Sequence, residues 1–103
     1  MSQIVGSTPA VGGPYHPAPC GYQQITAATL AAATALTLPA NATMAFIQVD
    51  TAGVRWRDDG TAPTASVGVQ LASAGSFWYY GDLTKIEFIA VSGSPVLNVS
   101  YYH

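Results

Sequence analysis

Few residues of this chain could do chemistry, and none has a spacing that positions it. His16 and Cys20 are four residues apart, and a histidine that activates a cysteine is a known nucleophilic pair. Both lie in a proline-rich segment, however, where a four-residue spacing holds no fixed geometry. The second histidine, His103, stands at the end of the sequence. Because acid–base catalysis needs a positioned group with a tuned pKa, we predict neither enzymatic activity nor a cofactor.

The Asp58-Asp59-Gly60 sequence has two interpretations. Its carboxylates could bind Ca²⁺, which takes six to eight oxygen ligands. The same residue types also form ordinary turns, and the chain has only three other acidic residues. One cysteine and two histidines do not make a tetrahedral zinc set. We therefore favour a turn and predict no metal site.

Arg55-Trp56-Arg57 is a candidate contact sequence. In a strand, alternation places both guanidinium groups on one face and the indole on the other. Arginine and tryptophan are enriched in interface hot spots, which makes Arg55 and Arg57 candidate interface residues. The alternative puts Trp56 in the core, which we favour, and pairs the arginines with aspartates nearby. Those aspartates are Asp50, Asp58 and Asp59.

Two aromatic clusters, Phe77-Trp78-Tyr79-Tyr80 and Tyr101-Tyr102, could form a platform for carbohydrate, since sugars stack on exposed rings. Consecutive strand residues alternate between faces, so about half of each cluster must be core. The remaining rings could instead cover a sheet edge or an interface. We take Tyr79 as a candidate interface residue.

The distribution of charge indicates that much of the surface is covered by other chains. Residues 1–49 contain no Asp, Glu, Lys or Arg, and all eight charges lie between Asp50 and Glu87. Only 8% of the residues are charged, against about 25% in typical domains, and mixed charge is what keeps monomers soluble. We therefore expect a homo-oligomer, either a dimer or a trimer.

Composition also narrows the class of protein. With 50% hydrophobic residues, the chain is no disordered polar segment. Three basic residues at a net charge of −2 cannot neutralise many phosphates, so we expect no nucleic-acid partner. Pro and Gly interrupt every apolar stretch before it reaches about 20 residues, so we expect no membrane partner.

Residues 1–21 are expected to form an extended arm. They contain four prolines and four glycines, which disfavour both a helix and a central strand. The segment Tyr15–Pro19 leans toward polyproline II. Apolar residues along the arm favour docking on a neighbouring subunit, whereas a disordered or self-packed tail is the alternative. The candidate contact residues of the arm are Val11, Tyr15 and Pro17.

From residue 22 to residue 103, short β-branched and aromatic runs alternate with turns. Seven or eight strands at spacings of about 8–12 residues predict an all-β fold, an antiparallel β-sandwich or jelly roll in one domain. The expected strands are Tyr22–Ala28, Leu30–Leu38, Met44–Val49, Val54–Arg57, Ser66–Leu71, Ser76–Tyr80, Lys85–Val91 and Val96–Tyr102.

Two of these segments carry finer expectations. The alanines of Leu30–Leu38 favour helix, so a short helical turn over Ala27–Ala33 is the alternative to a strand there. Asp50–Gly53 is expected to be a hairpin connection in which Gly53 supplies a positive φ. The expected core residues are Leu36, Leu38, Phe46, Val54, Trp56, Leu71, Leu83, Ile86, Phe88, Leu97 and Val99.

Residues 41–47 and 54–64 resemble a group of small virion proteins of tailed bacteriophages. The shared pattern is an aromatic residue between arginines, an Asp-Gly turn, then Pro-Thr and a glycine a few residues on, here Gly68. The resemblance covers roughly residues 25–102 and leaves the arm outside it. It continues through Trp78–Leu83, Ile86–Ile89 and Leu97–Tyr102.

The resemblance implies a structural role in the virion, assembled in the cytoplasm of a host bacterium, and brings no active site with it. We expect a capsid decoration or cement protein that contacts the major capsid protein or other virion proteins. A tail, collar or fibre component is the alternative within that class. A carbohydrate-binding adhesion module on the particle surface is the competing function.

Overall fold

The computed structural model describes residues 16–103, in which the chain forms eight strands and one short helix. Val11, Tyr15 and most of the expected arm lie outside the described residues. No helix in the described part is long and apolar enough to cross a membrane. The elements are β1 Pro19–Ile25, α1 Ala27–Leu30, β2 Thr34–Ala35, β3 Met44–Asp50, β4 Val54–Arg57, β5 Val69–Leu71, β6 Ser76–Tyr79, β7 Glu87–Ala90 and β8 Val96–Tyr102.

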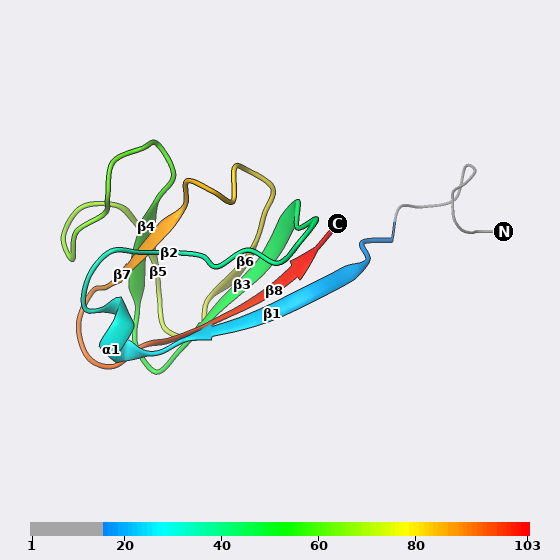
Figure 1. Cartoon of the computed structure of the whole chain (residues 1–103). Helices are drawn as coiled ribbons and strands as arrows, with labels where there is room; N and C mark the ends of the chain where they lie inside the picture. Colours follow the sequence, from blue (N-terminus) through cyan, green and yellow to red (C-terminus); the bar gives the residue numbers. More distant parts are fainter. Residues whose placement is uncertain (1–15) are drawn as a thin grey trace, which may run out of the picture.

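The strands form two four-stranded sheets, in the orders β1-β8-β3-β6 and β2-β7-β4-β5 (Figure 1). Counted from the two ends of the chain, each strand pairs antiparallel with its counterpart: β1 with β8, β2 with β7, β3 with β6 and β4 with β5. This pairing is that of a long hairpin rolled into two sheets, the jelly-roll arrangement of the β-sandwich. The predicted all-β sandwich is therefore confirmed.

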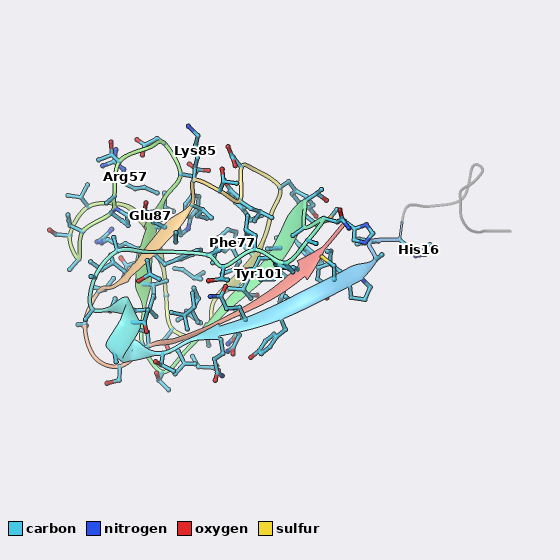
Figure 2. The ribbon with its side chains drawn as sticks, viewed as in Figure 1. His16, Arg57, Phe77, Lys85, Glu87 and Tyr101 are labelled. Carbon is cyan, nitrogen blue, oxygen red and sulfur yellow. The ribbon has the colours of Figure 1, made fainter. Side chains whose placement is uncertain are left out.

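The core lies between the sheets, where every second strand residue points inward. In β8, Leu97, Val99 and Tyr101 have no exposed surface, while the residues between them are partly exposed. Figure 2 shows Tyr101 and the partly buried Phe77 in the space between the sheets. This alternation leaves one outer side to each sheet, with its own set of side chains.

The expected core is correct at six positions and wrong at Phe46. Phe46 lies on the outer side of its sheet, because the buried residues of β3 are Ala45, Ile47 and Val49. A one-residue error in the expected alternation moves every side chain of a strand to the opposite face, and this is the error at Phe46. The confirmed residues are Val54, Leu83, Ile86, Phe88, Leu97 and Val99, while Leu36, Leu38, Trp56 and Leu71 are partly buried against the core.

The expected strand over Leu30–Leu38 is replaced by α1 and the two-residue β2. The chain is helical at the start of the segment because alanine favours helix and because the helical turn buries Leu30 completely. After the helix, the Thr34 hydroxyl at the start of β2 donates to the carbonyls of Thr29 and Ala32 and so ties β2 to the end of the helix. The short helical turn considered for this region is therefore the correct alternative.

The connection between β3 and β4 is not a hairpin, because the two strands belong to different sheets. Its positive φ lies at Thr51, at 69°, rather than at Gly53. The Thr51 hydroxyl donates to the carbonyl of Ser94 and so ties this crossover to the loop before β8. At Gly53 space rather than φ disfavours a side chain, since a Cβ there would lie in tight contact, 3.1 Å from the carbonyl oxygen of Leu71.

The first strand starts at Pro19, within the segment expected to be arm. A proline is compatible with this place because β1 lies at the edge of its sheet. Just before it, Ala18 and His103 exchange backbone hydrogen bonds of 2.9 and 3.0 Å. Residue 16 and the C-terminus therefore lie at the same end of the domain (Figure 1).

Candidate interaction surface

The two sheets differ sharply in charge. The strands of the β1-β8-β3-β6 sheet contain one charged residue, Asp50, at the end of β3. The other sheet carries Arg55, Arg57 and Glu87 on its strands. In Figure 2, Arg57, Lys85 and Glu87 lie on the side away from His16. The fold thus gathers most of the charge on one half of the molecule and leaves one sheet almost uncharged.

We call the outer side of the uncharged sheet the aromatic face. Its register places Trp78 opposite Phe46, Phe46 opposite Ser100, and Ser100 opposite Tyr22. The row therefore crosses all four strands. The residues of the aromatic face are Tyr22, Gln24, Met44, Phe46, Gln48, Asp50 at the rim, Trp78, Asn98, Ser100 and Tyr102, together with Tyr80 directly after β6.

Trp78 is the centre of the ring contacts on this face. Its ring centroid lies 5.1 Å from that of Phe46 and 5.2 Å from that of Tyr102. The Tyr80 ring lies 6.3 Å away and nearly parallel, at an interplanar angle of 15°. Trp78 is 41% exposed and Tyr80 is 70% exposed. Ring pairs at these separations favour each other, so the cluster presents a pre-formed apolar surface to solvent.

A row of amides runs beside the rings, with Asn98 at its centre. The Asn98 Oδ1 accepts hydrogen bonds from the Tyr22 hydroxyl (2.7 Å) and from Gln24 Nε2 (3.0 Å). Its Nδ2 donates to Gln48 Oε1 (2.9 Å) and to Asp50 Oδ2 (3.1 Å). Gln48 in turn donates to Asp50 Oδ1 at 2.7 Å. Both hydrogens and both acceptor positions of the Asn98 amide are therefore used within the face.

Tyr79 is not a surface residue, which corrects our assignment of it to an interface. It is 6% exposed, because β6 turns Phe77 and Tyr79 inward and Trp78 outward. Its hydroxyl donates to Asp58 Oδ2 at 2.7 Å. Burial and the nearby Asp58 carboxylate hold the pKa of Tyr79 well above its usual range. The exposed neighbours of Tyr79 are the residues that form the surface.

Arg55 acts within the fold as an anchor for a loop. Its Nη1 donates to the carbonyl of Gly68 at 2.8 Å, and its Nε donates to the carbonyl of Ala65 at 3.2 Å. The aspartate pairing considered for this residue is therefore replaced by backbone carbonyls. Gly68 has a φ of +142°, and a Cβ there would lie 3.1 Å from the Trp56 carbonyl oxygen. Only glycine fits this approach of the loop to β4.

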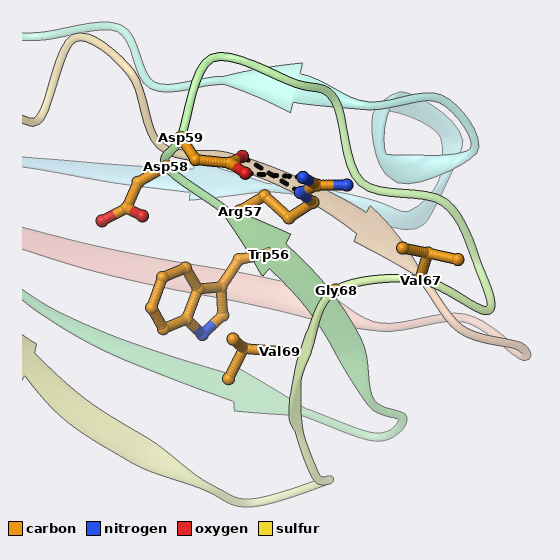
Figure 3. Close-up of a pocket in the computed structure, with 7 residues that line it drawn as sticks. All are labelled: Trp56, Arg57, Asp58, Asp59, Val67, Gly68 and Val69. Atoms are coloured by element: carbon orange, nitrogen blue, oxygen red, sulfur yellow. Dashed lines mark hydrogen bonds and ion pairs between the residues drawn. The ribbon is translucent and has the colours of Figure 1, made fainter.

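Arg57 forms the local ion pair that we considered for it. Its Nε donates to Asp59 Oδ1 at 3.0 Å, and its Nη2 contacts Asp59 Oδ2. This contact lowers the pKa of Asp59 and raises that of Arg57. The pair borders a cleft of about 400 Å³ whose apolar wall contains Trp56, Val67 and Val69 (Figure 3).

The other predicted residues do not come together. Pro17 and His16 are exposed in the segment before β1, while Cys20 is partly buried against the core. Asp58 and Asp59 lie at the bend that follows β4, where they bond to Tyr79 and Arg57. Within residues 16–103, no group of three or more His, Cys, Asp or Glu side chains could hold a metal ion. These residues make contacts within the fold rather than one shared site.

The sequence contains a signal for the aromatic face that parity could have revealed. Phe46, Gln48 and Asp50 lie on the same face of β3. Because Gln48 and Asp50 are polar and favour the solvent side, Phe46 is expected on that side too. In β6 the same alternation places Trp78 and Tyr80 on the outer side once Tyr79 is known to be buried. The pairing of these residues across four strands, in contrast, depends on strand order.

Comparison of the chain with models of protein families, with curated proteins and with solved structures gives no match.

Proposed function

We propose that this chain is a non-enzymatic structural protein of a tailed-bacteriophage virion, acting as a capsid decoration or cement protein. The observation that carries the proposal is the aromatic face, a four-stranded surface with a single charge at its rim. Interfaces are enriched in Trp, Tyr, Phe and Met and depleted of charge at their centre. A surface of this composition is suited to lasting contact with other protein subunits.

The chain topology supports the same role by analogy of fold. Jelly rolls are the architecture of many viral capsid domains, and also of lectin domains. Fold alone does not determine function, so this point adds to the surface composition and to the resemblance in residues 25–102. Together they favour a protein that contributes surfaces rather than chemistry.

The polar groups near the cleft support a structural role. The Asp58 carboxylate accepts from Tyr79, and Asp59 is held by Arg57. Arg55 is engaged by two backbone carbonyls. Each group serves to hold the loop over residues 58–68 in place. A catalytic constellation needs groups directed at a substrate position, and these are directed at one another.

A cement protein stabilises a shell by binding the assembled state alone, which shifts the assembly equilibrium toward it. Symmetric copies on a lattice gain further from multivalent attachment. The expected arm would add to this by lying across a seam between subunits. Its contact residues Val11 and Tyr15 lie outside the described residues, so the arm mechanism stays a prediction.

The copy number of the chain in purified particles tests the proposal. We expect quantitative mass spectrometry to find it in hundreds of copies per particle, in a fixed ratio to the major shell protein. A few to a few dozen copies would assign it to the tail, collar or fibres. Absence from the particle would remove the virion role. Deletion of residues 1–15, which leaves β1 (Pro19–Ile25) and the Ala18–His103 backbone bonds in place, tests the arm, and we expect weaker attachment to the shell.

Carbohydrate binding is the second candidate, and the nearly parallel exposed rings of Trp78 and Tyr80 favour it. Such a pair offers stacking area to a sugar ring. The test is saturable glycan binding that disappears in Trp78→Ala while the circular dichroism spectrum stays unchanged. Binding that survives this substitution would remove the aromatic face as a glycan site.

A further inference from the structure

We infer that the aromatic face binds the same face of a second copy of this chain, so that two copies form a closed dimer. The inference rests on the proposed function in that it takes the face to be an assembly surface. It goes further in naming the occupant and the contact residues. A surface that pairs with itself closes at two copies, which selects the dimer from the two oligomers expected from composition.

The low charge of the aromatic face allows two copies of it to face each other. Two copies of a charged surface repel each other, and like charges brought together cost binding free energy. The strands of the aromatic face carry only Asp50, at the rim, and both of its carboxylate oxygens accept hydrogen bonds from Gln48 and Asn98. The strands of the other sheet carry three charged residues, Arg55, Arg57 and Glu87, so that sheet is less suited to pairing with a second copy of itself.

The centre of the amide row can be covered without loss of hydrogen bonds by the Asn98 amide. An unsatisfied polar group buried at an interface opposes binding. The Asn98 amide already has four partners within the face, so a neutral surface can cover it.

The aromatic half of the face supplies the attraction. Trp78 and Tyr80 are held by contacts to Phe46 and Tyr102 and still expose 41% and 70% of their surface. Trp and Tyr are the residue types that dominate interface hot spots. Because neighbouring rings already restrict Trp78, little further ordering is needed on binding.

The size of the face fits a dimer of moderate affinity. Three strands of seven residues and one of four, at about 3.4 Å per residue and about 4.8 Å between strands, give roughly 400 Å² of flat area on each copy. Two such faces, with the relief of their side chains, approach the roughly 1,000 Å² that specific interfaces need. Interfaces of this small size are typical of weak association, so we expect a dissociation constant in the micromolar range.

The test is sedimentation equilibrium of the full chain over a concentration range from about 1 μM to about 500 μM. We expect a reversible transition from the 10.7 kDa monomer to twice that mass. Tyr80→Arg introduces a charge at the most exposed ring, where the fold tolerates it, and Trp78→Arg introduces one at the centre. Each is expected to raise the dimer dissociation constant at least about 30-fold.

Val69→Arg is the matched control, because Val69 is 54% exposed on β5 of the other sheet. It should leave the dissociation constant unchanged. A protein that stays monomeric over the whole range overturns the inference, and so does an oligomer that Tyr80→Arg leaves intact. Glycan capture by a monomer would point instead to carbohydrate. Because purified protein suffices, failure here is distinct from absence of the chain from particles, which would overturn the virion role.

Discussion

The Tyr79 hydroxyl donates a 2.7 Å hydrogen bond to the carboxylate of Asp58. Tyr79 belongs to β6 of the β1-β8-β3-β6 sheet, whereas Asp58 directly follows β4 of the other sheet. This bond therefore ties the two layers together at the end of the sandwich where the cleft lies. The bond also gives a partner to the hydroxyl of Tyr79, which the alternation of β6 buries.

Removal of this bond should destabilise the fold. We expect Tyr79→Phe to lower the free energy of unfolding by about 1–2 kcal/mol, because it removes a hydrogen bond to a charged acceptor. Urea unfolding measures the change. Tyr80→Phe is the control, since the exposed Tyr80 hydroxyl lies outside the core. Equal stability of the two variants would contradict the assigned role of Tyr79.

Alkaline pH should destabilise the protein through two tyrosines. Burial raises the pKa of Tyr101 to about 12, and burial together with Asp58 raises that of Tyr79. In the unfolded chain both hydroxyls titrate near pH 10. Their stabilising contribution is therefore complete below about pH 10 and is lost as the pH rises toward the folded values, by about 1.4 kcal/mol per pH unit for each hydroxyl.

Urea unfolding at several pH values between about 8 and 11.5 measures this slope. The variant Tyr101→Phe removes one of the two hydroxyls, so its stability should fall about half as steeply with pH. A slope equal to that of the unmodified chain would show that Tyr101 does not contribute.

Gly68 should tolerate a side chain less well than Gly60 does. Both have a positive φ, but a Cβ on Gly60 meets nothing within 4 Å, whereas one on Gly68 approaches the backbone of Trp56. We expect Gly60→Ala to cost about 1 kcal/mol and Gly68→Ala about 2–3 kcal/mol. Chemical denaturation measures both. Similar costs would mean that the close approach to β4 relaxes freely.

The two arginines of β4 should behave differently although they are two residues apart. Arg55→Ala removes the bonds to Gly68 and Ala65, so we expect a loss of about 1–2 kcal/mol. Hydrogen exchange at the amides of Thr64 and Val67, which bond across the same loop, should become faster. Arg57→Ala breaks only an exposed ion pair and should leave stability and exchange nearly unchanged. The reverse order would contradict the loop-anchor role of Arg55.

Periodicity alone was enough to predict the fold class and most strand positions. Turn residues bound short β-branched runs in this sequence, and β4 and β8 have the bounds expected for them. Local composition could not decide the segment from Leu30 to Leu38. There, alanine favours helix and alternation favours strand, and the burial of Leu30 settled the competition.

The identity of the interaction surface was beyond a local reading of the chain. The sequence showed that charge is scarce and that Trp78 and its neighbours must divide between two faces. In β3 the polar Gln48 and Asp50 indicate the outward parity, but in β6 the sequence did not show which parity points outward, because both parities contain large aromatic residues there. Burial between two sheets decides that question, and burial exists only once the sheets are packed.

The chain alone carries the strand pattern, the turns and the clustering of charge between Asp50 and Glu87. The tertiary structure decided which strands become neighbours. It brought Tyr22, Phe46, Trp78 and Asn98 onto one surface. The hydrogen bond from Tyr22 to Asn98 joins residues that are 76 positions apart in the sequence. Such contacts depend on sheet order, and sheet order is a property of the whole folded chain because each strand pairs with a partner distant in sequence.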